Sequence, residues 1–149
     1  MCYYTSCNNA NGGKTLMAEK KTVFLTGASG HMGWAGFKEL YKKKDKLNIV
    51  LLLRDSEKNR KKFANYLNDP SVKIVWGDLK KYDDVLKCVE GSDYVLHVGG
   101  MVSPSADYYP TKTIQTNTTA AKNIVDAVKA QPNKDDIKVV YIGTVAQTG

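Results

Sequence analysis

The sequence is poor in the residue types that build disulfide frameworks and metal sites. It has three cysteines and two histidines among its 149 residues. Cys2, Cys7 and Cys88 form an odd and unpatterned set, and His31 and His97 have no ligand-like neighbours at metal spacing. We therefore expect a reduced, cytoplasmic protein that binds no metal.

Long hydrophobic runs are also absent. No apolar stretch is long enough to cross a bilayer, and the contents of 25% charged and 42% hydrophobic residues are those of a globular protein. We expect no membrane-spanning segment. A chain of this length fits one domain with a sizeable core.

Acidic charge is scarcer than basic charge. The chain has 22 lysines and arginines and 15 acidic residues, which leaves a net charge of +7. Much of the excess lies in short clusters at 20–21, 42–44 and 60–62. These clusters are either solvated helix faces or part of an anion site. Nucleic acid is a weakly supported partner, because no zinc-finger spacing and no interleaved basic and aromatic stretch is present.

Periodicity divides the chain into a leader and one folded domain. Residues 1–19 are polar and aperiodic and lack the apolar core of a signal peptide, so we expect a flexible leader there and a domain over 20–149. Short apolar runs, typical of buried parallel strands, cover 22–27, 48–54, 72–77, 93–98 and 138–143. Helical patterns cover about 31–44, 56–68, 80–90 and 112–130. This alternation predicts an α/β fold: a Rossmann-type, doubly wound parallel sheet of five strands in the order 3-2-1-4-5.

A glycine-spaced turn joins the first strand to the first helix. In "TGASGHMG", Gly27, Gly30 and Gly33 suit a tight exit from the strand, close approach to a pyrophosphate, and close packing of helix on strand. Phosphates would lie at the helix N-terminus. Any tight strand-to-helix turn can use such glycines, so the strand and helix on either side carry the argument. The other residues of this turn that we expect at the cofactor are Ser29, His31 and Met32.

These residues give the chain a resemblance to a known family. "TGASGHMG" is similar to the TGxxGxxG motif of the extended short-chain dehydrogenases/reductases, the epimerase/dehydratase and dihydroflavonol-reductase-like group. The resemblance runs from Thr22 to Gly149 and departs at His31, where an aromatic residue is common. It implies that residues 20–149 are an NAD(P)-binding domain, with a dinucleotide and an unidentified small molecule as ligands.

The end of the second strand bears on the choice of cofactor. NAD sites place a carboxylate on the ribose hydroxyls, whereas NADP sites place a cation on the 2′-phosphate. Arg54 ends the strand, and a guanidinium binds phosphate through paired hydrogen bonds, which favours NADP. Two alternatives stay open: a solvated helix start, or Asp55 as the ribose ligand of NAD. The resemblance to a "VRDP" stretch of NADP-using reductases supports Arg54 and matches Lys61 to a second basic position.

The third and fourth strands end in further candidate cofactor contacts. Asp78 and Leu79 resemble the family's contact with the adenine edge, although Asp78 could equally cap the following helix. Gly99 and Gly100 resemble a segment whose small residues let the backbone lie against the nicotinamide-side ribose. The alternative for these two glycines is a flexible turn.

Two residues match catalytic positions of the family. Asn117, in "TNTTAAKN", matches the first asparagine of an NVxGTxN helix, which props the active-site water and backbone; the alternative is a polar helix residue. Thr144 lies where the family has a Ser or Thr whose hydroxyl would polarise the substrate oxygen; the alternative is an ordinary strand-end threonine.

The acid/base pair of the family has no match after Thr144. Such sites use Tyr-x-x-x-Lys, and the sequence stops at Gly149, so we expect a chain truncated before that helix and not catalytic alone. Tyr108 and Lys112 have the spacing but precede Asn117, and we expect Tyr108 in a loop over the cofactor cleft. The predicted function is the cofactor-binding part of an oxidoreductase, epimerase or dehydratase, or else a non-catalytic sensor or interaction module. Apolar surface left uncovered by the missing helix predicts self-association or a partner chain.

Overall fold

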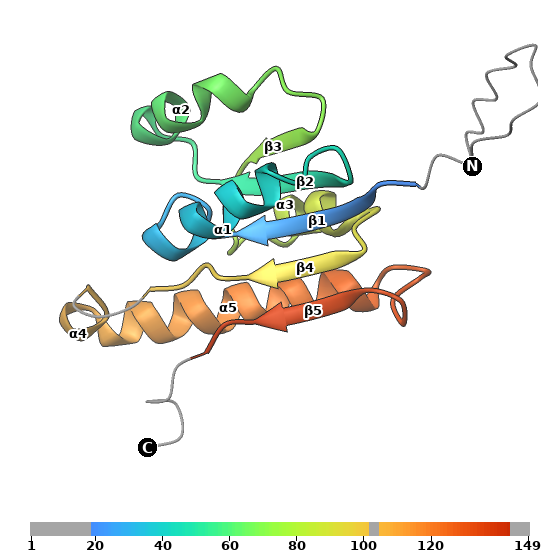
Figure 1. Ribbon diagram of the computed structural model, residues 1–149. Coiled ribbons are helices and arrows are strands. Elements are labelled where there is room, and N and C mark those ends of the chain that lie inside the picture. Colours follow the sequence, from blue (N-terminus) through green and yellow to red (C-terminus); the bar gives the residue numbers. More distant parts are fainter. Residues whose placement is uncertain (1–18, 102–104, 144–149) are drawn as a thin grey trace, which may run out of the picture.

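The computed structural model describes residues 19–101 and 105–143, which form one parallel sheet with helices on both faces (Figure 1). The strands are β1 (Lys21–Thr26), β2 (Leu47–Leu53), β3 (Val72–Trp76), β4 (Tyr94–His97) and β5 (Lys138–Tyr141). They pair in the order β3-β2-β1-β4-β5. The predicted fold class and strand order are confirmed. The predicted leader lies outside the described residues except for Glu19.

The helices begin near the predicted positions and several end earlier. They are α1 (His31–Tyr41), α2 (Glu57–Phe63), the short 3-10 helix η1 (Ala64–Tyr66), α3 (Tyr82–Val89), α4 (Ser105–Tyr108) and α5 (Pro110–Lys129). The placement of Tyr108 in a loop was wrong, because this residue ends α4, with a side chain that is 78% exposed. A helix of four residues is too short to produce a periodic pattern in the sequence.

One face of the sheet packs against α1, α2 and η1 through an aromatic cluster. Its members are Trp34, Phe37, Tyr41, Phe63 and Tyr66. The rings of Phe37 and Tyr66 meet edge to face with centroids 4.9 Å apart, which adds to the energy of apolar burial. The strands contribute Leu25, Leu51 and Leu53 to the same core. This packing fixes α1 and α2 beside the carboxyl ends of β1 and β2.

The other face packs against α3 and α5. Phe24 and Val95 of the sheet meet Val85 of α3 and Ile124 of α5 in a second core. Cys88 is fully buried there, and burial raises the pKa of its thiol to about 12. This cysteine is therefore a small core residue and not a reactive thiol.

The parallel register brings the ends of the strands to one edge. Thr26 at the end of β1 pairs with Leu52 of β2 and with His97, the last residue of β4. Leu53 at the end of β2 pairs with Trp76 at the end of β3. The segments 27–30, 54–56, 77–79 and 98–101 therefore follow the arrowheads in Figure 1 along a single edge. Ligands of open parallel sheets bind at this edge.

Strand β5 leaves apolar surface in contact with solvent. All four of its residues are exposed, Val139 to 45% and Tyr141 to 56%. It pairs with β4 on one side and with no other strand of the described ranges. Within those same ranges, none of the helices is both long enough and apolar enough to span a membrane.

Candidate functional site

The turn from β1 to α1 is held tightly by two of its three glycines. Gly27 has a φ of +73°, and a Cβ added there would lie 2.7 Å from the Cα of Gly99. A Cβ added at Gly33 would overlap the carbonyl oxygen of Gly27. Both positions therefore require glycine for the chain's own packing: α1 lies against the turn, and the turn lies against the segment after β4.

Gly30 differs from these two glycines. It is exposed, and a Cβ there would make only an ordinary contact of 3.4 Å with the oxygen of Gly27. It is also the N-cap residue of α1, and none of the described side chains caps this helix end. The N–H groups of the first helical turn consequently face an open position that favours an anion. His31 and Met32, both exposed, begin the same helix.

Thr26 joins the turn to the end of β4 by three hydrogen bonds. Its buried Oγ1 accepts from the N–H groups of Val98 (3.1 Å) and Gly99 (2.9 Å) and lies 2.8 Å from Nδ1 of His97. Two donors already fill its lone pairs, so the hydroxyl proton is donated to His97. Burial lowers the pKa of His97 below its ordinary value, which keeps the ring neutral and Nδ1 available as the acceptor. The sequence did not indicate this role of Thr26.

Leu79 and Gly99 meet behind the turn. A Cβ added at Gly99 would lie 3.0 Å from Cδ1 of Leu79, and the Nδ2 of Asn123 donates to the carbonyl oxygen of Leu79 at 2.8 Å. The neighbouring Asp78 accepts from the N–H of Lys80 at 2.9 Å. The alternative that Asp78 caps the following helix was wrong, because the N-cap of α3 is Lys81. Contact of Asp78 with adenine stays a prediction.

Asn117 holds the segment that follows β4. Its Oδ1 accepts from the N–H of Met101 at 2.8 Å, and its Nδ2 donates to the carbonyl oxygen of the same residue at 3.0 Å. The Oδ1 also lies 3.3 Å from the position of a Cβ at Gly100. Asn117 thus fixes the backbone beside Gly99 and Gly100 and acts here as a positioning residue. The other predicted catalytic residue, Thr144, lies outside the described residues.

The charged residues after β2 divide into paired and unpaired groups. Arg60 donates to both carboxylate oxygens of Asp55, at 2.6 and 2.8 Å, and Lys61 pairs with Glu57 at 2.6 Å. Arg54 is exposed at the tip of β2, and its guanidinium has no partner among the described side chains. Of the two predicted cations, Arg54 is therefore available to a ligand, whereas Lys61 is already paired.

A cavity of about 510 Å³ opens between the glycine turn, α1 and α2. Ser29, Gly30 and His31 line it on one side, and Lys58 and Lys62 of α2 line it on the other. The Nζ of Lys62 donates to the carbonyl oxygen of Ser29 at 2.9 Å. Lys62 belongs to the basic cluster at 60–62 that the sequence left open as part of an anion site, but a basic cluster does not show which of its members face a cavity.

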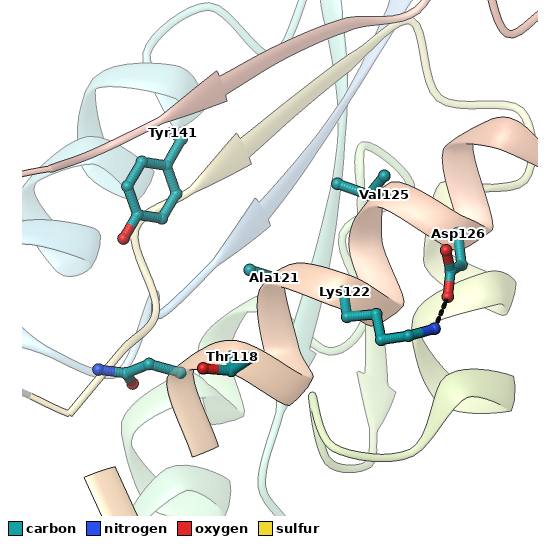
Figure 2. Close-up of a pocket in the computed structure, with 7 residues that line it drawn as sticks. Thr118, Ala121, Lys122, Val125, Asp126 and Tyr141 are labelled. Carbon is teal, nitrogen blue, oxygen red and sulfur yellow. Dashed lines mark hydrogen bonds and ion pairs between the residues drawn. The ribbon is translucent and has the colours of Figure 1, made fainter. Parts of the chain in front are cut away.

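A second hollow lies between α5 and β5, and Figure 2 shows Tyr141 of β5 opposite Ala121 and Val125 of α5. Its volume is about 490 Å³. Asn117 is among its lining residues, and the ion pair of Lys122 with Asp126 lies beside it on α5 (Figure 2). This groove is separate from the glycine turn and is largely apolar.

The geometry of the edge defines the class of protein. It combines a parallel sheet in the order 3-2-1-4-5, a glycine turn with an open helix N-terminus, and an exposed arginine at the tip of β2, which together fit a dinucleotide. The model of the NAD dependent epimerase/dehydratase family matches residues 23–149. The chain belongs to this family.

Individual relatives agree with this assignment. The UDP-glucose 4-epimerase of Rickettsia bellii (strain RML369-C) is 33% identical over 128 residues, which are 83% of this chain and 36% of that protein. The chain thus spans about a third of the length of the curated relatives it matches. Among solved structures, the WbmH enzyme of Bordetella bronchiseptica, in complex with NAD⁺, has a TM-score of 0.66 at 23% identity over 87% of this chain and 41% of its own.

A further solved structure supports the fold. The UDP-glucose 4-epimerase of Bifidobacterium longum, in complex with NAD⁺ and UDP, has a TM-score of 0.68 at 17% identity and covers 87% of this chain and 38% of its own. At this level of identity the likeness establishes the fold alone. The described part of the chain has the architecture of the NAD-binding domain of oxidoreductases and epimerases.

Proposed function

We propose that this chain binds NADP at the carboxyl edge of its sheet and forms the cofactor-binding part of an oxidoreductase, epimerase or dehydratase. NADP is favoured over NAD by the difference between two side chains that follow β2, those of Arg54 and Asp55. The carboxylate of Asp55, the alternative ribose ligand, is occupied by Arg60, whereas the guanidinium of Arg54 has no partner among the described side chains. An unpaired cation at this place suits a 2′-phosphate.

Different residues of the chain would contact different parts of the cofactor. The first turn of α1 beside Gly30 would hold the pyrophosphate, Asp78 with Leu79 would contact the adenine, and Gly99 with Gly100 would lie along the nicotinamide-side ribose. Thr26 and Asn117 would hold that last segment in place through the hydrogen bonds described above. When bound, a nicotinamide dinucleotide supplies hydride transfer.

We further propose that the 149-residue chain alone binds the cofactor without turnover. The sequence contains no Tyr-x-x-x-Lys after Thr144, and the family's acid/base chemistry needs both groups. The Rickettsia bellii relative is a UDP-glucose 4-epimerase, so a nucleotide sugar is one candidate substrate of a protein that contains this domain.

Thermal denaturation with NADP and with NAD tests the proposal. A ligand at 100 times its dissociation constant stabilises the fold by about 2.7 kcal/mol, which gives a clear rise in Tm. We expect a larger rise with NADP than with NAD, and a reduction of this difference in Arg54→Ala. Lys46→Ala is the matched control, because Lys46 is exposed and lies just before β2, at the opposite edge of the sheet. No rise with either dinucleotide would contradict the proposal.

A second candidate function is a non-catalytic module that reports cofactor binding to another chain. The apolar groove between α5 and β5 favours it, because Asn117 reaches both this groove and the segment beside Gly100. This candidate requires that NADP binding change the association of the chain with itself or with a partner. Identical sedimentation profiles with and without saturating NADP would argue against it.

A further inference from the structure

Three lysines line the cavity between the glycine turn and α2, and none of the described carboxylates neutralises them. Lys38 of α1 and Lys58 and Lys62 of α2 line it, and none of the three forms an ion pair with an acidic residue of the described ranges. In contrast, the adjacent Arg60 and Lys61 are paired with Asp55 and Glu57. Positive charge without counter-charge is therefore concentrated on the side of α2 that faces the turn.

The surroundings of Lys62 favour an anion in this cavity. Its Nζ donates to the carbonyl oxygen of Ser29 and lies 4.3 Å from the centre of the Trp34 ring, which leaves the ammonium partly buried over the cavity. Burial, followed by the charges of Lys58 and Lys38, lowers the pKa of Lys62 below its ordinary value. An anion placed among these lysines would relieve their mutual repulsion.

The cavity adjoins the proposed cofactor edge. Gly30 and Ser29 belong both to the cavity lining and to the glycine turn, and α2 begins three residues after Arg54 at the tip of β2. The ribose of the adenosine half belongs at the end of the second strand in this fold. A phosphate monoester carries close to two negative charges at neutral pH and needs several cationic donors.

We propose that this cavity takes the 2′-phosphate of NADP and that Lys58 and Lys62, rather than Lys61, act together with Arg54 to distinguish NADP from NAD in this chain. The proposal rests on the proposed cofactor function and assigns the specificity of that site to residues that the family resemblance does not single out. Ser29 lies within the same lining and is the hydroxyl-bearing residue of the segment 27–30.

Calorimetric titration of the 149-residue chain with NADP and with NAD is the test. We expect Lys58→Gln and Lys62→Gln each to raise the Kd for NADP about 10-fold, the loss of one charge-assisted hydrogen bond, and to change the Kd for NAD much less. Lys61→Gln tests the competing assignment and should leave the ratio of the two constants as in the wild type. Lys46→Gln serves as the neutral control.

Trp34 provides a second readout in the same experiment. In a Trp76→Phe background, 2′-AMP should change the emission of Trp34, whereas 5′-AMP and inorganic phosphate at equal concentration should change it less; an equal response to phosphate would mean a general anion site and overturn the assignment. Binding of both dinucleotides with no preference for NADP, or a preference lost only in Lys61→Gln, would overturn the inference and leave cofactor binding intact. If neither dinucleotide bound, the proposed function would fail and this inference with it.

Discussion

At the scale of single residues, Thr26 holds the end of β1 to the segment that follows β4. Replacing it with valine keeps the shape but leaves the N–H groups of Val98 and Gly99 without their acceptor. We expect Thr26→Val to lower the free energy of unfolding by about 1–3 kcal/mol, the cost of unpaired buried donors, in urea denaturation. Thr26→Ser keeps the hydroxyl and should lose less; equal losses in the two variants would show that the hydroxyl is not the cause.

The site residues that belong to a sequence motif could be predicted. The roles that depend on which strands are neighbours could not. Gly27, Gly33 and Asn117 were predicted from motif positions, and each makes a close backbone contact or a paired hydrogen bond. Thr26 belongs to the same motif, but its bonds run to a strand 71 residues later in the chain. Such a partner emerges only once β1 and β4 are known to be neighbours.

The start of α2 offers a test at the scale of one element. Ser56 is the N-cap, and its Oγ accepts from the N–H of Asn59 at 3.2 Å. Ser56→Ala should lower the free energy of unfolding by about 1 kcal/mol in urea denaturation. Ser56→Asp restores an acceptor and should recover most of that loss. Because this cap starts the helix that carries Lys58 and Lys62, Ser56→Ala should also weaken NADP binding; wild-type stability in Ser56→Ala would mean that the cap contributes nothing.

The strands were more predictable than the helices. Each predicted strand overlaps the observed one with ends that differ by at most two residues, because buried parallel strands are short, continuous apolar runs bounded by polar residues. The helix predicted to run to residue 44 ends at Tyr41, since the lysines that follow form turns that lead into β2. The helix α4 was missed because a single helical turn has no period to detect.

Strand β5 sets an expectation for the whole molecule. Its exposed valines and its unpaired edge are surface that proteins usually cover. We expect the chain to self-associate as its concentration rises, and Val140→Lys, which places a charge on this strand, to reduce that association. Sedimentation velocity over a concentration series measures it. Leu67→Lys, at an exposed leucine outside the sheet, is the control; a wild-type chain that stayed monomeric throughout would contradict the expectation.

At this same scale, topology could be predicted from the sequence but charge pairing could not. Alternating strands and helices with right-handed crossovers leave few orders, and the order 3-2-1-4-5 is the one observed. Which lysines remain unpaired depends on where each turn of α2 points. Lys61 faces Glu57 one helical turn before it, while Lys62, the next residue, faces the cavity.

The contact between Gly27 and Gly99 has a consequence for the history of the chain. Here two stretches of main chain touch directly, with no side chain between them. Where two side chains pack together, substitution of one by a larger residue can be compensated by substitution of the other by a smaller one. Ordinary core contacts therefore change through paired substitutions. A contact between two backbone segments has no side chain whose substitution could compensate for a larger residue at either position. We therefore expect this pair of positions to outlast the surrounding core as sequences diverge, and to be the steadiest landmark for aligning remote members of the family.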